Sequence, residues 1–177
     1  HRDLHSFPTR RSSDLPTAGH AVALSQRTAS PDRIGVNIES AHAILAGLDP
    51  ADEMGFCLSF GKLWSVHLND QNGLKFDEDK VFGSVDLRRA FNQVRILDHH
   101  DYGVNGEFVG LDVKAMRTQK DALATKHLSN SRTMFLRLLD VSRSLDEGVV
   151  QALIAERDYE ELDLYILTKL MGLPGKG

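Results

Sequence analysis

The sequence lacks several features that define whole classes of protein. Of its 177 residues only one is a cysteine, Cys57, so no internal disulfide framework can form, and a reducing cytoplasmic setting is expected. No apolar run approaches the roughly 20 residues that cross a bilayer. The net charge is -4 and no basic patch is present, so neither a membrane nor a nucleic-acid partner is expected. Apolar residues make up 41%, enough for the core of one domain, and Cys57 lies in an apolar stretch typical of that core.

The first fifteen residues differ in character from the rest. They read HRDLHSFPTRRSSDL, which is charged, shows no periodicity and lacks the apolar stretch of a signal peptide. The part HSFPTRRSSDL resembles the translation of a common sequencing adapter, and a genuine N-terminal arm is the alternative. We therefore expect residues 1–15 to lie outside the fold, and we expect the natural coding sequence to begin upstream of this chain.

Short apolar stretches alternate with helical patterns along the chain. The predicted strands are Arg33–Ser40, Leu63–Leu68 and Phe108–Lys114. The predicted helices are Thr17–Ala29, Asp49–Lys62, Asp86–Asp101, Ser129–Leu145, Leu145–Arg157 and Tyr159–Met171. This order predicts an α/β fold with parallel strands joined by right-handed crossovers. Three strands are too few for a closed barrel, so we expect residues 16–145 to be the C-terminal half of a (β/α)8 TIM barrel and residues 146–177 to be a helical extension.

Polar residues gather where each predicted strand ends. Glu39 and His42 follow the first strand, His67 ends the second, and Asp112 lies within the third. In a barrel, the carboxyl ends of the strands share the face that carries the active site. Converging carboxylates repel one another unless a cation lies between them, and carboxylate with imidazole suits Mg, Mn or Co. The pattern therefore predicts a divalent-metal site.

Ordinary structural explanations compete with this prediction. Asp112 lies in an apolar run, where an unpaired charge is costly, and Lys114 could simply be its ion-pair partner. Asp77, Glu78 and Asp79 lie in a long polar loop after the second strand and could be solvated surface acids. The joint placement of these groups at strand ends favours Asp77 and Asp79 as ligands, with Glu78 pointing to solvent.

Three separated blocks resemble the C-terminal half of the xylose isomerase family of metal-dependent barrels. The family's strand-six motif, a glutamate followed three residues later by a histidine, is matched by VNIESAHAILAGL. Its strand-seven block with a D-x-D loop is matched by LWSVHLNDQNGLKFDEDKVFGSVDLRRAF. Its strand-eight motif D-x-K-x-x-R-T is matched by FVGLDVKAMRT. The blocks follow the family's order between Ile34 and Leu145.

The resemblance implies a site for two divalent cations, Mn, Mg or Co. The implied ligands are Glu39, His42, His67, Asp77, Asp79 and Asp112. Glu39 would bridge the two metals, and Asp112 would bind the first of them. Lys114 and His42 would be the catalytic side chains. His67 departs from the family, because xylose isomerases carry an aspartate there and the similar L-rhamnose isomerases carry a histidine ligand in an HFND-like stretch. The imidazole favours Mn, Co or Zn over Mg and leaves the sugar open.

The implied reaction is the aldose–ketose isomerisation of a monosaccharide through a hydride shift. The family's strand-one histidine and its strand-five glutamate and lysine have no counterparts here. We therefore expect this chain to be an inactive fragment of a protein that is a dimer or tetramer at full length. Two alternatives stay open: a sugar epimerase or polyol dehydratase on the same barrel, and a non-catalytic binding or structural barrel.

Overall fold

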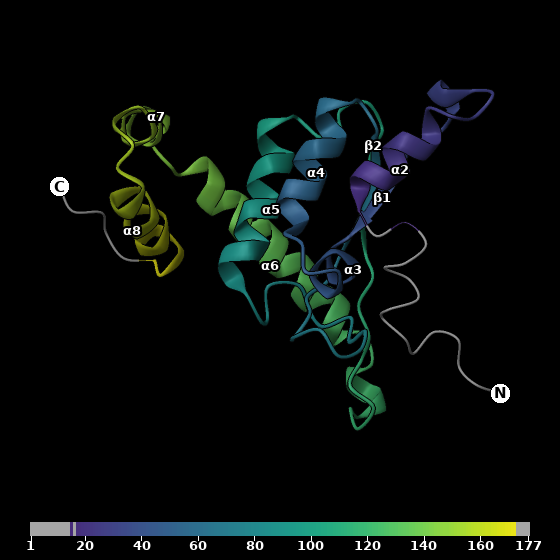
Figure 1. The fold of residues 1–177 in the computed structure, drawn as a ribbon. Coiled ribbons are helices and arrows are strands. Elements are labelled where there is room, and N and C mark those ends of the chain that lie inside the picture. The colour runs from purple at the N-terminus through teal and green to yellow at the C-terminus, as the bar shows by residue number, and fades with distance from the viewer. Residues whose placement is uncertain (1–14, 16, 173–177) are drawn as a thin grey trace.

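A sheet of three strands forms the centre of the chain (Figure 1). The computed structural model describes residue 15 and residues 17–172, so the predicted artefact segment lies, apart from Leu15, outside the described residues. Seven α-helices accompany the sheet within the described part. The strands are β1, Val36–Glu39; β2, Leu63–Leu68; and β3, Phe108–Leu111.

The sheet has the order β1-β2-β3, and both strand pairs are parallel. The predicted α/β architecture is therefore confirmed, and it is consistent with part of a TIM barrel. The third strand is shorter than predicted because the backbone leaves the sheet after Leu111, and the Lys114 N–H donates to the carbonyl of Asp79 at 2.8 Å. Register pairs Glu39 with His67 and His67 with Gly110, so the three carboxyl ends lie at one edge of the sheet.

The helices follow the strands in the order that crossover connections require. They are α2 (Ala18–Ser25), α3 (Ser40–Leu45), α4 (Pro50–Ser59), α5 (Leu87–His99), α6 (Lys126–Arg143), α7 (Glu147–Glu156) and α8 (Tyr159–Leu170). Their starts agree with local chemistry: Asp49 caps α4 ahead of Pro50, and the Asp86 carboxylate accepts from the Arg89 N–H at the start of α5. The sequence signals therefore fixed where the crossover helices α4 and α5 begin.

Helix α4 packs against β1 and β2, α6 packs against β3, and α5 lies between α4 and α6 (Figure 1). The fully or nearly fully buried side chains there are Val36, Ile38, Met54, Cys57, Val66, Leu68, Phe91, Val94 and Leu97. The prediction that Cys57 fills the core is confirmed, since none of its surface is exposed. Burial also raises the pKa of the Cys57 thiol to about 11, with a smaller contribution from the charge of Glu53.

Helices α7 and α8 lie at the end of α6, away from the sheet (Figure 1). Each of the two helices buries a single residue, Val150 in α7 and Ile166 in α8. Within residues 15 and 17–172, no helix is both long and apolar enough to cross a membrane.

Candidate metal centre

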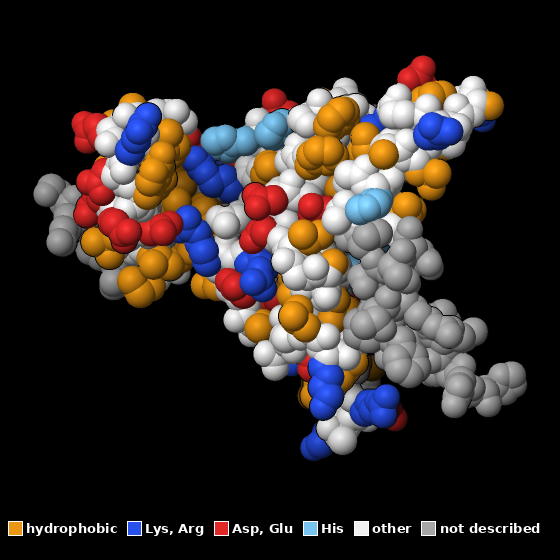
Figure 2. All heavy atoms as spheres, viewed as in Figure 1, with side chains coloured by type: hydrophobic (Ala, Val, Ile, Leu, Met, Phe, Trp, Pro, Cys, Tyr) orange, Lys and Arg blue, Asp and Glu red, His pale blue; other side chains and the backbone are white. Residues whose placement is uncertain are grey.

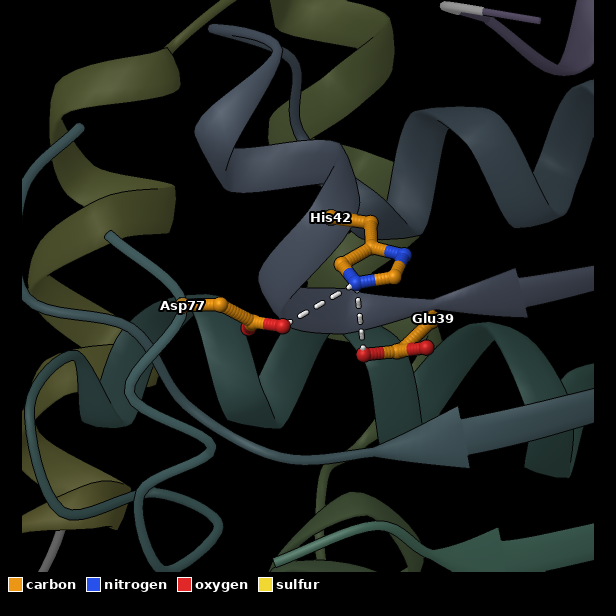
Figure 3. Close-up of side chains that lie close together, drawn as sticks. All are labelled: Glu39, His42 and Asp77. Carbon is orange, nitrogen blue, oxygen red and sulfur yellow. Dashed lines mark hydrogen bonds and ion pairs between the residues drawn. The ribbon is translucent and has the colours of Figure 1, made fainter. Parts of the chain in front are cut away.

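The carboxyl end of β1 presents Glu39 and, one helical turn later, His42. Glu39 is the N-cap residue of α3, yet its side chain makes no capping hydrogen bond, so its carboxylate is available to other partners. His42 Nε2 lies 3.1 Å from Glu39 Oε1, as expected for residues three apart on one helix face (Figure 3). The same nitrogen lies 3.3 Å from Asp77 Oδ2. A single imidazole nitrogen therefore meets two carboxylates.

The loop between β2 and α5 brings Asp77 to this place. It folds back on the strand ends through a backbone pair in which Asp70 and Lys80 exchange two hydrogen bonds of 2.9 Å. Asp77 lies 35 residues from His42 in the chain, and the folding back of this loop brings the two side chains into contact (Figure 3). Glu78, between the two candidate ligands of the loop, is half-buried, and its Oε2 accepts from the Asn72 N–H at 3.0 Å. The prediction that Asp77 belongs with the strand-end residues therefore has a geometric basis.

The ends of β2 and β3 bring together His67 and Asp112. His67 Nδ1 lies 3.6 Å from Asp112 Oδ2. Gly110 leaves room for this ring, because a Cβ at that position would lie 3.2 Å from His67 Cδ2. The side chain of Asp112 is 47% exposed, so its charge is not buried, although it lies in an apolar run of the sequence. The apolar run around it forms a sheet strand whose residues are exposed or half-buried.

Two groups of possible metal ligands result, and they share one residue. The first is Glu39, His42 and Asp77, and the second is Glu39, His67 and Asp112, with the donor atoms of each group within 4.8 Å of one another. Ligand atoms at about 2.1 Å from an octahedral cation are about 3 Å apart when adjacent and about 4 Å apart when opposite. Both groups are close to that spacing, and carboxylate with imidazole is a donor set that suits Mn, Co or Zn. The residues present therefore fit two divalent cations bridged by Glu39.

Asp79, the remaining predicted ligand, belongs to neither group among the described residues. Its Oδ1 accepts from Asn69 Nδ2 at 2.9 Å, and its Oδ2 forms an ion pair with Lys114 Nζ. Lys114 is therefore the partner of Asp79, and the suggested pairing of Lys114 with Asp112 was wrong. The physical reason is that the chain turns out of the sheet after β3 and carries Lys114 toward the loop.

Burial and crowding by like charges raise the pKa of Glu39. Burial is the largest cause, and the negative charges of Asp112, Asp77 and Asp79 add to it. The nearby His42 opposes the shift. A carboxylate that is difficult to ionise among other carboxylates is stabilised by a cation placed between them.

The two loop acids differ in their surroundings. The hydrogen bond with His42 is the main cause that lowers the pKa of Asp77. Burial raises the pKa of Asp79, although the hydrogen bond with Lys114 acts in the opposite direction. The same bond with Asp79 raises the pKa of Lys114, so this side chain remains a cation at neutral pH.

Three consecutive buried polar residues, Asn69, Asp70 and Gln71, have roles that the sequence did not reveal. They follow β2 and are at most 3% exposed. The Asp70 carboxylate accepts from the N–H groups of Gln71, Val85 and Asp86, and so closes the loop onto the start of α5. Burial raises the pKa of Asp70, and these amide hydrogen bonds oppose the shift. The only signal in the sequence is an uninterrupted polar run directly after a buried strand.

The comparisons with known proteins agree with the resemblance seen in the motifs. No family model matches the chain. A xylose isomerase from Streptomyces lividans is 36% identical over 145 residues, which is 81% of this chain. The chain spans about a third of that relative's length, since the match covers 36% of it.

Proposed function

We propose that this chain, a member of the xylose isomerase family, supplies one part of the two-metal centre of an aldose–ketose isomerase. The ligands proposed are Glu39, His42, His67, Asp77 and Asp112, and Asp79 lies beside them as the ion-pair partner of Lys114. The observation that carries the proposal is the pair of donor groups that share Glu39. A shared carboxylate is the natural bridge between two cations held a few ångströms apart.

The chemistry of the centre follows from its donor set. When bound, two divalent cations (Mn, Mg or Co) act as Lewis acids and as a template that holds two oxygens of an open-chain sugar while hydride moves between adjacent carbons. Glu39 and Asp77, whose side chains are only 14% and 15% exposed, would hold their cation away from bulk water. His67 and Asp112 are more open, at 37% and 47%, and would form the side that a sugar can approach.

Lys114 and His42 are the proposed catalytic side chains. The side chain of Lys114 is 62% exposed, and its ammonium group is anchored on Asp79. Because it stays charged, we propose that it stabilises negative charge on a substrate oxygen and does not act as a base. His42 Nε2 lies beside the carboxylates of Glu39 and Asp77 and would join them as a ligand of the same cation.

The substrate class proposed is a monosaccharide, and His67 is the residue that bears on its identity. An imidazole replaces the acid that xylose isomerases carry at this position, which removes one negative charge from the centre. The same observation favours a second candidate, a sugar epimerase or polyol dehydratase built on the same centre. The products distinguish these possibilities, because isomerisation of an aldose yields a ketose and epimerisation does not.

Further proposals concern the whole protein. We propose that it works in the cytoplasm and is a homo-oligomer, and that residues 146–170 of α7 and α8 take part in contacts between subunits. A role of these helices in subunit contacts is supported by their exposed apolar side chains, which are Val149, Ile154, Tyr159, Leu164 and Leu167. We also propose that the 177-residue chain alone does not isomerise sugars, because its two donor groups provide only three protein ligands each.

Titration with Mn²⁺ tests the metal centre directly. We expect the chain to bind Mn²⁺, and Asp77→Asn to weaken the binding at least about tenfold, because the amide keeps the shape of the side chain but removes its charge. Isothermal titration calorimetry and the electron paramagnetic resonance signal of free Mn²⁺ both measure this.

Glu78→Gln is the matched control, since Glu78 is the adjacent acid, is half-buried like Asp77 and lies outside both donor groups. It should leave the Mn²⁺ affinity within about twofold of the unmodified chain. Equal affinities for the Asp77→Asn and Glu78→Gln variants would remove Asp77 from the metal centre. In the whole protein, incubation with several aldoses should give ketoses, and formation of an epimer without any ketose would favour the second candidate.

A further inference from the structure

We propose that Asn69 is a positioning residue of the metal centre: it fixes the carboxylates of Glu39 and Asp79 relative to each other and to helix α3. The proposal rests on the proposed metal function. No role for this side chain follows from the motifs, and it is not one of the proposed ligands.

The amide of Asn69 has hydrogen-bond partners on both of its ends. Asn69 is 1% exposed and directly follows β2. Its Nδ2 donates to Asp79 Oδ1 at 2.9 Å and to Glu39 Oε1 at 3.4 Å. Its Oδ1 accepts from the Ala41 N–H at 2.7 Å. A buried amide without partners would be costly, so these bonds fix the orientation of the group.

The bond with Ala41 explains why Glu39 is available to the metal centre. A helix needs acceptors for the N–H groups of its first turn, and the side chain of the N-cap residue usually provides one. Glu39 occupies that position in α3 but makes no such bond. Asn69, from the neighbouring strand, accepts the amide of Ala41 instead. The helix is thereby capped from outside, and the Glu39 carboxylate is not needed for capping and can face the cations.

The donor side of the amide lies between two acids that disfavour each other's charge. The negative charge of Asp79 is one of the causes that raise the pKa of Glu39. Asp79 also has an unusual backbone conformation, with φ at 44°, which persists only where the surroundings hold it. Asn69 holds its side chain, while the Lys114 N–H holds its carbonyl at 2.8 Å. A neutral donor can bond both acids without competing with a cation for the site.

Gln93 provides a matched comparison. It is also a buried amide, 2% exposed, and accepts from Ser40 Oγ at 2.6 Å and donates to the Arg89 carbonyl at 3.3 Å. None of these partners is a carboxylate of the metal centre. Asn69→Leu and Gln93→Leu therefore remove the same chemical group, with a similar loss of buried hydrogen bonds, and only the first touches the acids.

The test compares Mn²⁺ affinity and amide hydrogen exchange in these two variants and the unmodified 177-residue chain. We expect both variants to lower the melting temperature, since each leaves buried partners unpaired. Asn69→Leu should also weaken Mn²⁺ binding at least about tenfold, whereas Gln93→Leu should change it less than about threefold. In the metal-free chain, Asn69→Leu should speed amide exchange in residues 77–80 and at Ala41, and Gln93→Leu should not. If Asn69→Leu does not fold, Asn69→Ser should show the same direction of change.

The outcomes separate this proposal from the proposed function. If the unmodified chain binds Mn²⁺ and Asn69→Leu binds it equally well, the positioning role is overturned and the metal centre stands. If the unmodified chain does not bind Mn²⁺, the metal centre is overturned. The exchange rates then decide about Asn69: faster exchange in residues 77–80 for Asn69→Leu alone supports it as the residue that fixes Asp79, and equal exchange in the two variants overturns that role.

Discussion

Two regions of the chain are held together by different physics. At the sheet, the loop of residues 69–86 is tied to the strand ends by buried polar groups, among them Asn69, Asp70 and Gln71. In the helical pair α7 and α8, each helix buries one apolar residue and leaves many others exposed. Figure 2 shows apolar side chains interspersed with acids over the surface of this pair.

Ion pairs with exposed acids join the helical pair to α5. Arg88 pairs with Asp163 at 2.9 Å, and Arg95 pairs with Glu147 at 3.1 Å. Exposed ion pairs stabilise a fold by about 0–1 kcal/mol each, whereas a buried donor or acceptor that loses its partner costs about 1–3 kcal/mol. The region that must hold ligands within tenths of an ångström is thus the one with buried, hydrogen-bonded polar groups. The other region is suited to being covered by a partner.

The largest difference between the regions should come from apolar truncation. Leu97→Ala in α5 removes a side chain that is 4% exposed, and we expect it to lower the free energy of unfolding by about 2–5 kcal/mol. The same change at Leu167 in α8, which is 44% exposed, should cost about 1 kcal/mol or less. Urea denaturation followed by circular dichroism measures both values. Equal losses would show that α8 is as firmly packed as the core helix.

A smaller difference should separate two aspartates that accept backbone amides. Asp70→Ala leaves three N–H groups without their acceptor, one in a buried and two in half-buried positions, and should cost about 2–3 kcal/mol, with faster amide exchange at Val85. Asp146→Ala removes an exposed cap of α7 that accepts from Gly148 at 2.8 Å and should cost about 1 kcal/mol. If the two variants lost the same stability, burial would not be what distinguishes the loop from the extension.

The smallest expected effect is a dependence of stability on alkaline pH that originates in the core. The pKa of Cys57 is raised to about 11 from an ordinary value of 9.0, so above pH 9 the unfolded chain releases a proton that the folded chain keeps. Stability should therefore fall as pH rises, by about 1.4 kcal/mol at pH 10, and fully only above the folded pKa. Cys57→Ala should be less sensitive by that amount. Parallel slopes for the two chains between pH 8 and 10 would contradict a buried thiol.

Much of the fold was predictable because its signals are local. The second strand, Leu63–Leu68, has the bounds that its apolar pattern predicted, and the caps at Asp49 and Asp86 mark helix starts. The other two strands are shorter than predicted. Residue hydropathy does not reveal where a chain leaves a sheet. The backbone N–H of Lys114 donates to the carbonyl of Asp79 in the loop, so it is not available to extend β3.

The candidate site was only partly predictable. Glu39, His42, His67, Asp77 and Asp112 come together as their place at strand ends and in the loop suggested. Asp79 does not join them, because Lys114 and Asn69 hold its two oxygens. Such partners are set by side-chain packing between segments far apart in the chain, which neither periodicity nor motif spacing records.

By itself, the sequence determined the class of fold, the parallel order of the strands and the residue types available to bind a metal. These follow from hydropathy period, helix caps and the strand-end rule, which depend on neighbours along the chain. Only the tertiary structure decided that Glu39 is shared by two donor groups, that Asp112 is half exposed, and that Asn69 caps α3 from the next strand. The physical reason is that burial and hydrogen-bond partnership belong to contacts across the sheet and loop, and these exist only once the chain has folded.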